Sequence, residues 1–222
     1  LKDSDEWPLD GYISECTILP YWEKAGTKPS WFKGGNPSLR EYIEYAPSDD
    51  DLNYTLISLK LVKNAGRDFA PDDTLRAWIR NLPFSAVCTA EKIAYRNRVM
   101  GMSFPETATF LNPYREWIGA QIRTDFYGYI CPGEKAEAAR MAWNDAACSH
   151  TKNGIYGAMW VSAAIAAAFV ETDAEAVIRR GLEQVPADSR FTEHMISTVE
   201  AAKANGDDFE ATFDDVEERL GD

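Results

Sequence analysis

Three consecutive carboxylates, at Asp49, Asp50 and Asp51, follow the hydroxyl of Ser48 in the segment Ser48–Tyr54. Adjacent negative charges repel one another, so solvent, backbone amides or a divalent cation must hold them together. A hydroxyl and carboxylates at successive positions are the hard oxygen ligands that Mg²⁺ or Ca²⁺ prefers. The segment is equally typical of a helix start, where Ser or Asp caps and acidic first turns are common. Both interpretations stay open on local sequence alone.

A second acidic pair in the same chain serves as a comparison. Asp72 and Asp73 follow Pro71, and Leu75 and Trp78 come after them at helical spacing. Proline fits the first position of a helix, and acids suit its first turn. We interpret this pair as a structural helix start, so the case for Ser48–Asp51 must come from the rest of the chain.

The overall charge limits the kinds of partner. The chain has 222 residues, 45% of them hydrophobic, which is enough for one domain with a real core. Its formal net charge is −13 and it has no basic stripe, so we expect no nucleic-acid groove. The longest apolar stretch, 163–170, is too short to span a bilayer, so we expect no membrane contact either.

The cysteines lack the spacing of a zinc site. Cys16, Cys88, Cys131 and Cys148 form no CxxC pair, and the chain has only 2 histidines. Scattered cysteines in a chain without a signal peptide indicate a reducing compartment, so we expect a cytoplasmic protein.

The hydrophobic pattern predicts an all-α fold. We interpret residues 1–222 as one all-α domain, irregular over 1–47 and helical over 48–222. Neither end resembles a natural terminus, so we expect an internal fragment. Helical periodicity and stop signals predict helices over the following ranges, with 114–129 left ambiguous: 52–64, 72–81, 85–100, 105–110, 133–149, 153–170, 173–185, 190–205 and 208–220.

A second group of chemically capable residues lies in 112–125. Gly119 and Ala120 permit close approach of a ligand to the backbone. The guanidinium of Arg123 suits a phosphate or a carboxylate ligand. Alternatively, Arg123 pairs with Asp125 or another acid to satisfy a buried position.

A third group lies in 148–157. Gly154 and Gly157 are spaced so that a ligand diphosphate or ribose, or another helix, can approach a helix start closely. His150 stands at the junction before that helix, where it is either a ligand-facing residue or a satisfied core histidine.

The order of these three groups resembles the ADP-ribosylglycohydrolase family, also called the dinitrogenase-reductase-activating glycohydrolase family, and within it a bacterial branch. The resemblance spans about residues 50–190. It rests on Ser48–Tyr54, on the Gly-Ala-Gln-Ile-Arg segment 119–123, and on the Ser-His-Thr-Lys-Asn-Gly-Ile-Tyr-Gly segment 149–157.

The resemblance implies an orthogonal multi-helix bundle with two Mg²⁺ ions in a central cleft. It implies hydrolysis of an N- or O-glycosidic bond to ADP-ribose, on a modified protein or a small-molecule conjugate. We take Asp50 and Asp51 as catalytic candidates, with Asp51 as the candidate general base. The resemblance itself implies Ser48, Asp49 and Asp50 as metal ligands, whereas Asp51 stands where the family often has Thr. The substrate-binding set that follows from it is Gly119, Ala120, Gln121, Arg123, His150, Asn153 and Gly154.

Two other functional interpretations accompany the hydrolase. Two family motifs lack a counterpart: a Gly-rich acidic motif expected before Asp3, and an Asp-x-Asp-Thr motif expected beyond Asp222. An incomplete metal set favours a module that binds ADP-ribose or a nucleotide without turnover. A terpene-synthase-like lyase also uses an Asp-rich helix start, but the second metal triad that it requires fails at Cys148 and Lys152.

Overall fold

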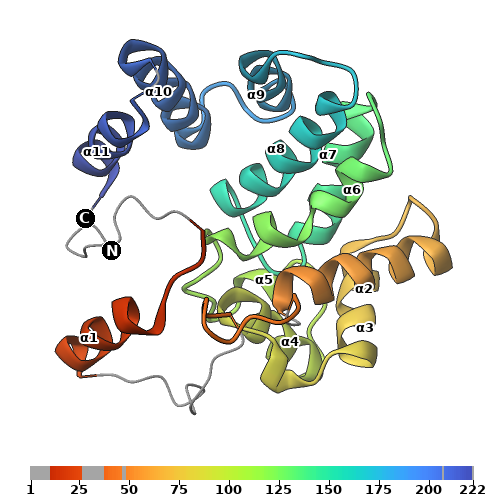
Figure 1. Cartoon of the computed structure of the whole chain (residues 1–222). Helices are drawn as coiled ribbons and strands as arrows, with labels where there is room; N and C mark the ends of the chain where they lie inside the picture. Colours follow the sequence, from red (N-terminus) through yellow and green to blue (C-terminus); the bar gives the residue numbers. More distant parts are fainter. Residues whose placement is uncertain (1–10, 27–37, 47–48, 207, 222) are drawn as a thin grey trace. The chain divides into compact units, whose positions relative to one another are not determined.

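The computed structural model describes residues 11–26, 38–46, 49–206 and 208–221 (Figure 1). The chain forms two units, residues 1–49 and residues 50–222, and each is described by itself. The boundary lies within two residues of the expected change at 47/48 from irregular to helical chain. Ser48, one of the predicted metal ligands, lies outside the described residues.

The first unit contains one described helix, α1 (Glu15–Ala25). The hydroxyl of Ser14 accepts a hydrogen bond from the backbone of Thr17 at 3.3 Å and so caps the helix start. The segment 38–46 folds back on this start, because the Glu41 carboxylate accepts from the Glu15 amide at 3.0 Å. Leu39, in the same segment, is buried.

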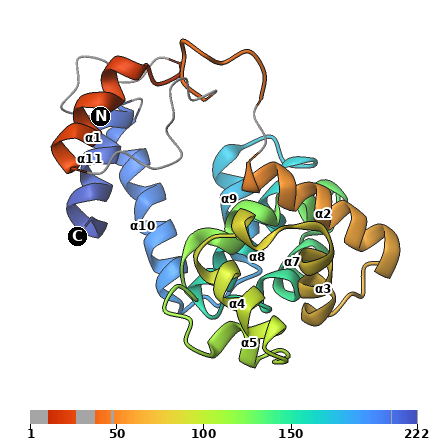
Figure 2. The ribbon, with the colours of Figure 1, turned by 90° about the horizontal axis from the view of Figure 1, so that it is seen from below.

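The second unit begins with α2 (Asp50–Ala65) and α3 (Pro71–Asn81). Gly66 ends α2 with a left-handed φ of 77°, as expected from sequence. The predicted structural role of the second acidic pair is confirmed, because the Asp73 carboxylate accepts a hydrogen bond from the Ala70 amide at 2.8 Å. Helix α3 lies against α2, against α4 (Thr89–Val99) and against α7 (Lys135–Ala146) (Figure 2).

The helix predicted over 85–100 is shorter in the structure. A turn of 3₁₀ helix, η1 (Phe84–Ala86), precedes α4 (Thr89–Val99), and the prediction of one continuous helix is wrong. Val87 and Cys88 between them are extended, and Val87 is fully buried from that extended backbone. Val87 therefore fits the helical spacing of apolar residues in the sequence, although its backbone is not helical.

The ambiguous region 114–129 resolves into two short elements. They are η2 (Ile118–Arg123), a 3₁₀ helix, and α6 (Asp125–Tyr129), and a short α5 (Glu106–Thr109) precedes them. Thr124 joins η2 to α6, and its hydroxyl donates to the carbonyl of Ala158 at 3.1 Å. The segment is thus fixed to the next long helix, α8.

The centre of this unit is the antiparallel pair α7 (Lys135–Ala146) and α8 (Asn153–Ala168). Their buried faces carry mainly alanine, and such small side chains let two helix backbones pack closely. The buried alanines are Ala138, Ala139, Ala142, Ala146, Ala158, Ala163, Ala164, Ala166 and Ala167. Close packing leaves little space for adjustment, so this pair forms a rigid support for η2.

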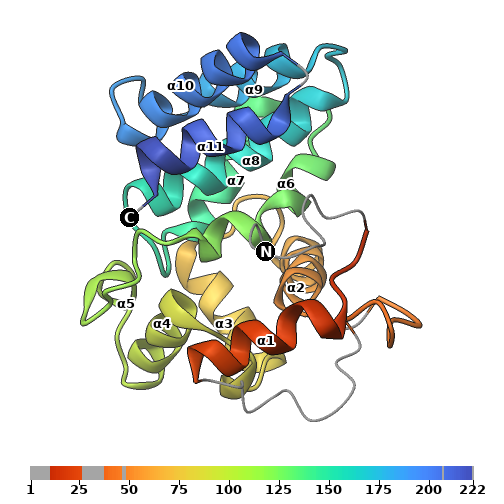
Figure 3. The ribbon, with the colours of Figure 1, turned by 60° about the vertical axis from the view of Figure 1, so that its left-hand side comes forward.

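Three capped helices complete the unit: α9 (Ala174–Leu182), α10 (Arg190–Asn205) and α11 (Phe209–Leu220). Each begins where the sequence places a capping side chain, at Asp173, Ser189 and Asp208. Helix α9 packs on α8, and α10 packs on α11 (Figure 3).

The predicted all-α class and bundle type are confirmed. No strand occurs in residues 11–26, 38–46, 49–206 or 208–221. Among these same residues, no helix has both the length and the apolar character that a membrane span requires.

The cap at α3 gives a first prediction. Asp73→Ala should lower the free energy of unfolding by about 1 kcal/mol, because the Ala70 amide and the Arg76 side chain each lose their hydrogen bond to it. Urea unfolding measures this loss. Any activity of the folded protein should be unchanged, and a loss of activity without a loss of stability would contradict the structural role.

Candidate active site

A pocket of about 160 Å³ opens beside the first turn of α2. Asp50 and Tyr54 line it from α2, Thr89 and Glu91 from α4, and Gly119 from η2. Thr89 has a left-handed φ of 38°, which a β-branched residue rarely adopts, so the backbone at this wall is strained. The pocket thus brings together α2, α4 and η2, which are distant in sequence, around the carboxyl groups of Asp50 and Glu91.

Beneath the pocket lies a fully buried arginine. The Arg123 Nη1 atom donates to Glu91 Oε1 at 2.5 Å, and its Nε atom donates to Asp145 Oδ1 at 2.5 Å. A third donor reaches Ser149 Oγ at 2.9 Å. The guanidinium also lies 4.7 Å from the centroid of the Trp78 ring. The Arg123 side chain thus contacts α4, α7, the loop after α7, and α3.

These contacts shift the pKa values of the buried groups. Burial alone would lower the pKa of Arg123, but the charges of Asp145 and Glu91 outweigh it and raise that pKa. Burial raises the pKa of Glu91 more than the Arg123 charge lowers it. Two carboxyl groups share one guanidinium, and Asp145 also accepts from the Tyr127 hydroxyl at 2.8 Å. Burial therefore favours the protonated form of Glu91, which faces the pocket.

Gly119 lies directly over the Glu91 carboxylate. A Cβ atom on Gly119 would collide with both carboxylate oxygens of Glu91. Glycine is thus required here for a close approach of backbone to side chain rather than for a special φ. The carboxyl group reaches the pocket because this position carries no side chain.

His150 is buried in the same polar cluster. Its Nδ1 atom pairs with Ser149 Oγ at 2.8 Å, and its Nε2 atom lies 3.9 Å from Glu91 Oε1. Burial, with the Arg123 charge as a smaller cause, lowers the pKa of His150 to about 2, so the imidazole is neutral. The chain thus places His150 next to the pocket-lining Glu91 but behind the pocket wall.

Comparison with protein-family models identifies the chain. The model described as ADP-ribosylglycohydrolase matches residues 14–222, nearly the whole length. The chain belongs to the ADP-ribosylglycohydrolase family. Neither the comparison with curated proteins nor that with solved structures gives a match. The family is one of hydrolases acting on ADP-ribosylated substrates, which favours the first of the three functional interpretations.

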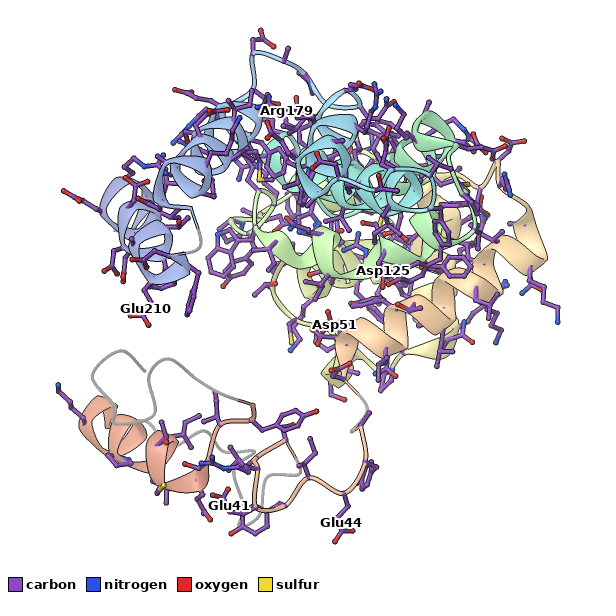
Figure 4. All side chains as sticks on the ribbon, turned by 45° about the horizontal axis from the view of Figure 1, so that its top comes forward. Glu41, Glu44, Asp51, Asp125, Arg179 and Glu210 are labelled. Atoms are coloured by element: carbon purple, nitrogen blue, oxygen red, sulfur yellow. The ribbon has the colours of Figure 1, made fainter. Side chains whose placement is uncertain are left out.

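The three acids of the segment 49–51 occupy different environments. Asp50 lines the pocket, whereas Asp51 is exposed and does not line it. Asp49 is the last residue of the other unit. Figure 4 labels Asp51 at the start of α2 and Asp125 at the start of α6. Asp125 accepts a hydrogen bond from Thr55 of α2 at 3.2 Å and so tethers the two helices.

The predicted substrate-binding residues divide into three groups. Gly119 lines the pocket, while Ala120, Arg123, His150 and Gly154 are buried. The geometry of Arg123 favours pairing with acids, although its partners are Glu91 and Asp145 rather than Asp125. Gly154 packs against His150, as a Cβ there would lie 2.9 Å from the His150 ring.

The remaining two residues face other parts of the surface. Gln121 is half-buried against α8, where its side-chain oxygen lies beside Gly157. Asn153 donates to Glu116 at 3.1 Å and lines a separate pocket with Phe191 and His194 of α10.

Sequence reasoning missed the most connected acids of the site. Glu91 and Asp145 each place a carboxyl group on the buried face of their helix, next to Ala90 and Ala146. An acid on an alanine-rich face is the signal that could have identified them, because a buried carboxylate needs a cationic or hydrogen-bonding partner. Asp145 is bound in this cluster, which also removes it from any lyase metal triad.

The contact over Glu91 gives a second prediction. Gly119→Ala should destabilise the protein by about 1–3 kcal/mol through overpacking, and it should block the pocket to ADP-ribose. Gly128→Ala is the control, because its added Cβ collides with Ile165 on the α6–α8 contact, away from the pocket. Urea unfolding and calorimetric titration with ADP-ribose test both variants. Equal ligand affinity of the two folded variants would contradict this role of Gly119.

The raised pKa of Glu91 gives a third prediction. The folded state holds the Glu91 proton more tightly than the unfolded chain, which releases it near the ordinary value of 4.5. The resulting stabilisation is complete below that value and is lost as the pH rises through the folded pKa. Glu91→Gln has no proton to lose, so urea unfolding across this range should show a smaller decline in stability for the variant. Identical pH slopes would mean that Glu91 is ionised throughout.

Proposed function

We propose that this protein hydrolyses the N- or O-glycosidic bond between ADP-ribose and a protein side chain or small molecule, in the pocket between α2, α4 and η2. The observation that carries the proposal is the meeting of Asp50 and Glu91 at one pocket in a member of the ADP-ribosylglycohydrolase family. Glycoside hydrolysis uses such a pair of carboxyl groups, one as acid and one as base or nucleophile.

The two acids are suited to different roles. Glu91 is buried, its pKa is raised, and Arg123 holds it through Oε1, so it is suited to donate a proton to the leaving atom. Asp50 stands in the first turn of α2, where the helix dipole favours a negative charge. It is suited to stabilise positive charge developing on the sugar or to orient the attacking water.

The rim of the pocket supports a nucleotide substrate. Trp117 lines the pocket and is 55% exposed, and Ile118 beside it is 64% exposed. A flat, accessible aromatic ring next to a small pocket that contains two carboxyl groups offers a stacking surface for a base. Asp51, an exposed acid on the same turn as Asp50, is kept as the alternative general base.

The acids that line the pocket do not by themselves form a magnesium site. In the part of the chain that the structure describes, no group of three or more His, Cys, Asp or Glu side chains is arranged to hold a metal ion. Asp50 and Glu91 alone do not form a binding set for two ions, since Glu91 is already held by Arg123. The roles of Asp50 and Glu91 do not depend on Mg²⁺, and a magnesium requirement is a separate proposal.

Release of free ADP-ribose from arginine-linked and serine-linked conjugates tests the function. Asp50→Asn and Glu91→Gln should each lower turnover by about 100-fold or more, because each removes one acid–base group at the reacting bond. Asp73→Ala, the structural variant, should retain turnover. A chelator should stop the reaction and added Mg²⁺ restore it if the ion is required.

The outcomes separate the alternatives. Binding of ADP-ribose without release from either conjugate would contradict hydrolysis and support a nucleotide-binding module. Turnover that survives chelation would contradict only the magnesium requirement. Unchanged turnover in both acid variants would show that the reaction occurs elsewhere on the protein.

A further inference from the structure

Tyr54 lines the same pocket, and the proposed reaction assigns no role to it. Its ring is only 3% exposed and packs at 5.4 Å from the ring of Trp78, centroid to centroid. The Arg123 guanidinium lies 5.7 Å from the same ring. Because the ring is held on these sides, the position of its hydroxyl is fixed before any ligand arrives.

The hydroxyl of Tyr54 has no hydrogen-bond partner among the described residues. Three other buried polar atoms share this condition, on Thr74, Thr107 and His150, but none of those residues lines the pocket, whereas Tyr54 does. Buried polar groups in native proteins nearly always have a partner, so the unpaired hydroxyl of a residue that lines a pocket is suited to a partner from outside the chain.

The size and charge of the pocket restrict that partner. A volume of about 160 Å³ is close to that of a cavity that holds a single six-membered ring. Asp50 and Glu91 line the same space, and their carboxyl groups disfavour a phosphate and favour a neutral group with hydroxyls. A single sugar ring fulfils both conditions.

We infer that Tyr54 is a substrate-binding residue whose hydroxyl forms a hydrogen bond with the sugar ring at the scissile bond of the substrate. The inference rests on the proposed function for the identity of the ligand. Burial raises the pKa of the Tyr54 hydroxyl, with the Glu91 charge adding to the effect, so the hydroxyl keeps its proton and can donate it. Asp50, Tyr54 and Glu91 then contact one ring from α2 and α4.

Tyr54→Phe tests the inference by removing a single oxygen atom. The dissociation constant of ADP-ribose should rise about 10-fold, the effect of one lost hydrogen bond. The dissociation constant of ADP, which lacks the terminal ribose, should be the same for the wild-type protein and the variant. Calorimetric titration measures both ligands.

Thermal unfolding supplies a readout that is independent of ligands. Tyr54→Phe should melt at the wild-type temperature or above, because the hydroxyl stabilises no described protein group. Tyr127→Phe is the matched control, since that hydroxyl bonds to Asp145 and Ser58. It should melt lower, and the variant that remains folded should bind ADP-ribose as the wild type does.

Each result bears on one claim. Wild-type protein that fails to bind ADP-ribose contradicts the proposed function, whereas equal affinity of wild type and Tyr54→Phe for ADP-ribose overturns the inference alone. An equal loss for ADP and ADP-ribose also overturns it, because the hydroxyl would then act on the nucleotide part. A lower melting temperature for Tyr54→Phe would assign the hydroxyl to the fold instead.

Discussion

The buried charges around Arg123 are the constraint on which the second unit depends. One guanidinium, fully removed from solvent, holds α4 through Glu91, α7 through Asp145 and the following loop through Ser149. Removing one partner from such a cluster leaves an uncompensated buried charge, at a cost of about 3–5 kcal/mol. The same contact orients the pocket acid, so folding of the core and assembly of the site are a single event.

The fold class could be predicted because local signals agree with the final packing. Capping residues at Asp173, Ser189 and Asp208 begin their helices as the sequence indicates. The prediction fails at Val87, where burial in an extended conformation imitates a helical period. The hydrophobic period indicates which side chains are buried, but it does not specify the backbone conformation at each of those positions.

The site could be predicted only in part. Asp50 and Gly119, which the acidic segment and the glycine-containing segment single out in the sequence, line the same pocket. Glu91 and Tyr54 could not be found in this way. For Glu91, the alanine-rich face indicates burial but does not reveal the partner, Arg123, which is distant in the chain. For Tyr54, no described residue bonds to the hydroxyl, and the neighbouring sequence does not show this.

The contact between Gly119 and Glu91 also has a genetic consequence. Every single-base change in a glycine codon that replaces glycine by another amino acid introduces a residue with a Cβ atom, and the carboxylate of Glu91 occupies the space that this atom needs. Any such replacement of Gly119 is therefore expected to lower the stability of the protein. A compensating route must first shorten or move Glu91, and that change disturbs the charge balance of Arg123. A substitution at Gly119 is therefore best tolerated together with a second change at Glu91.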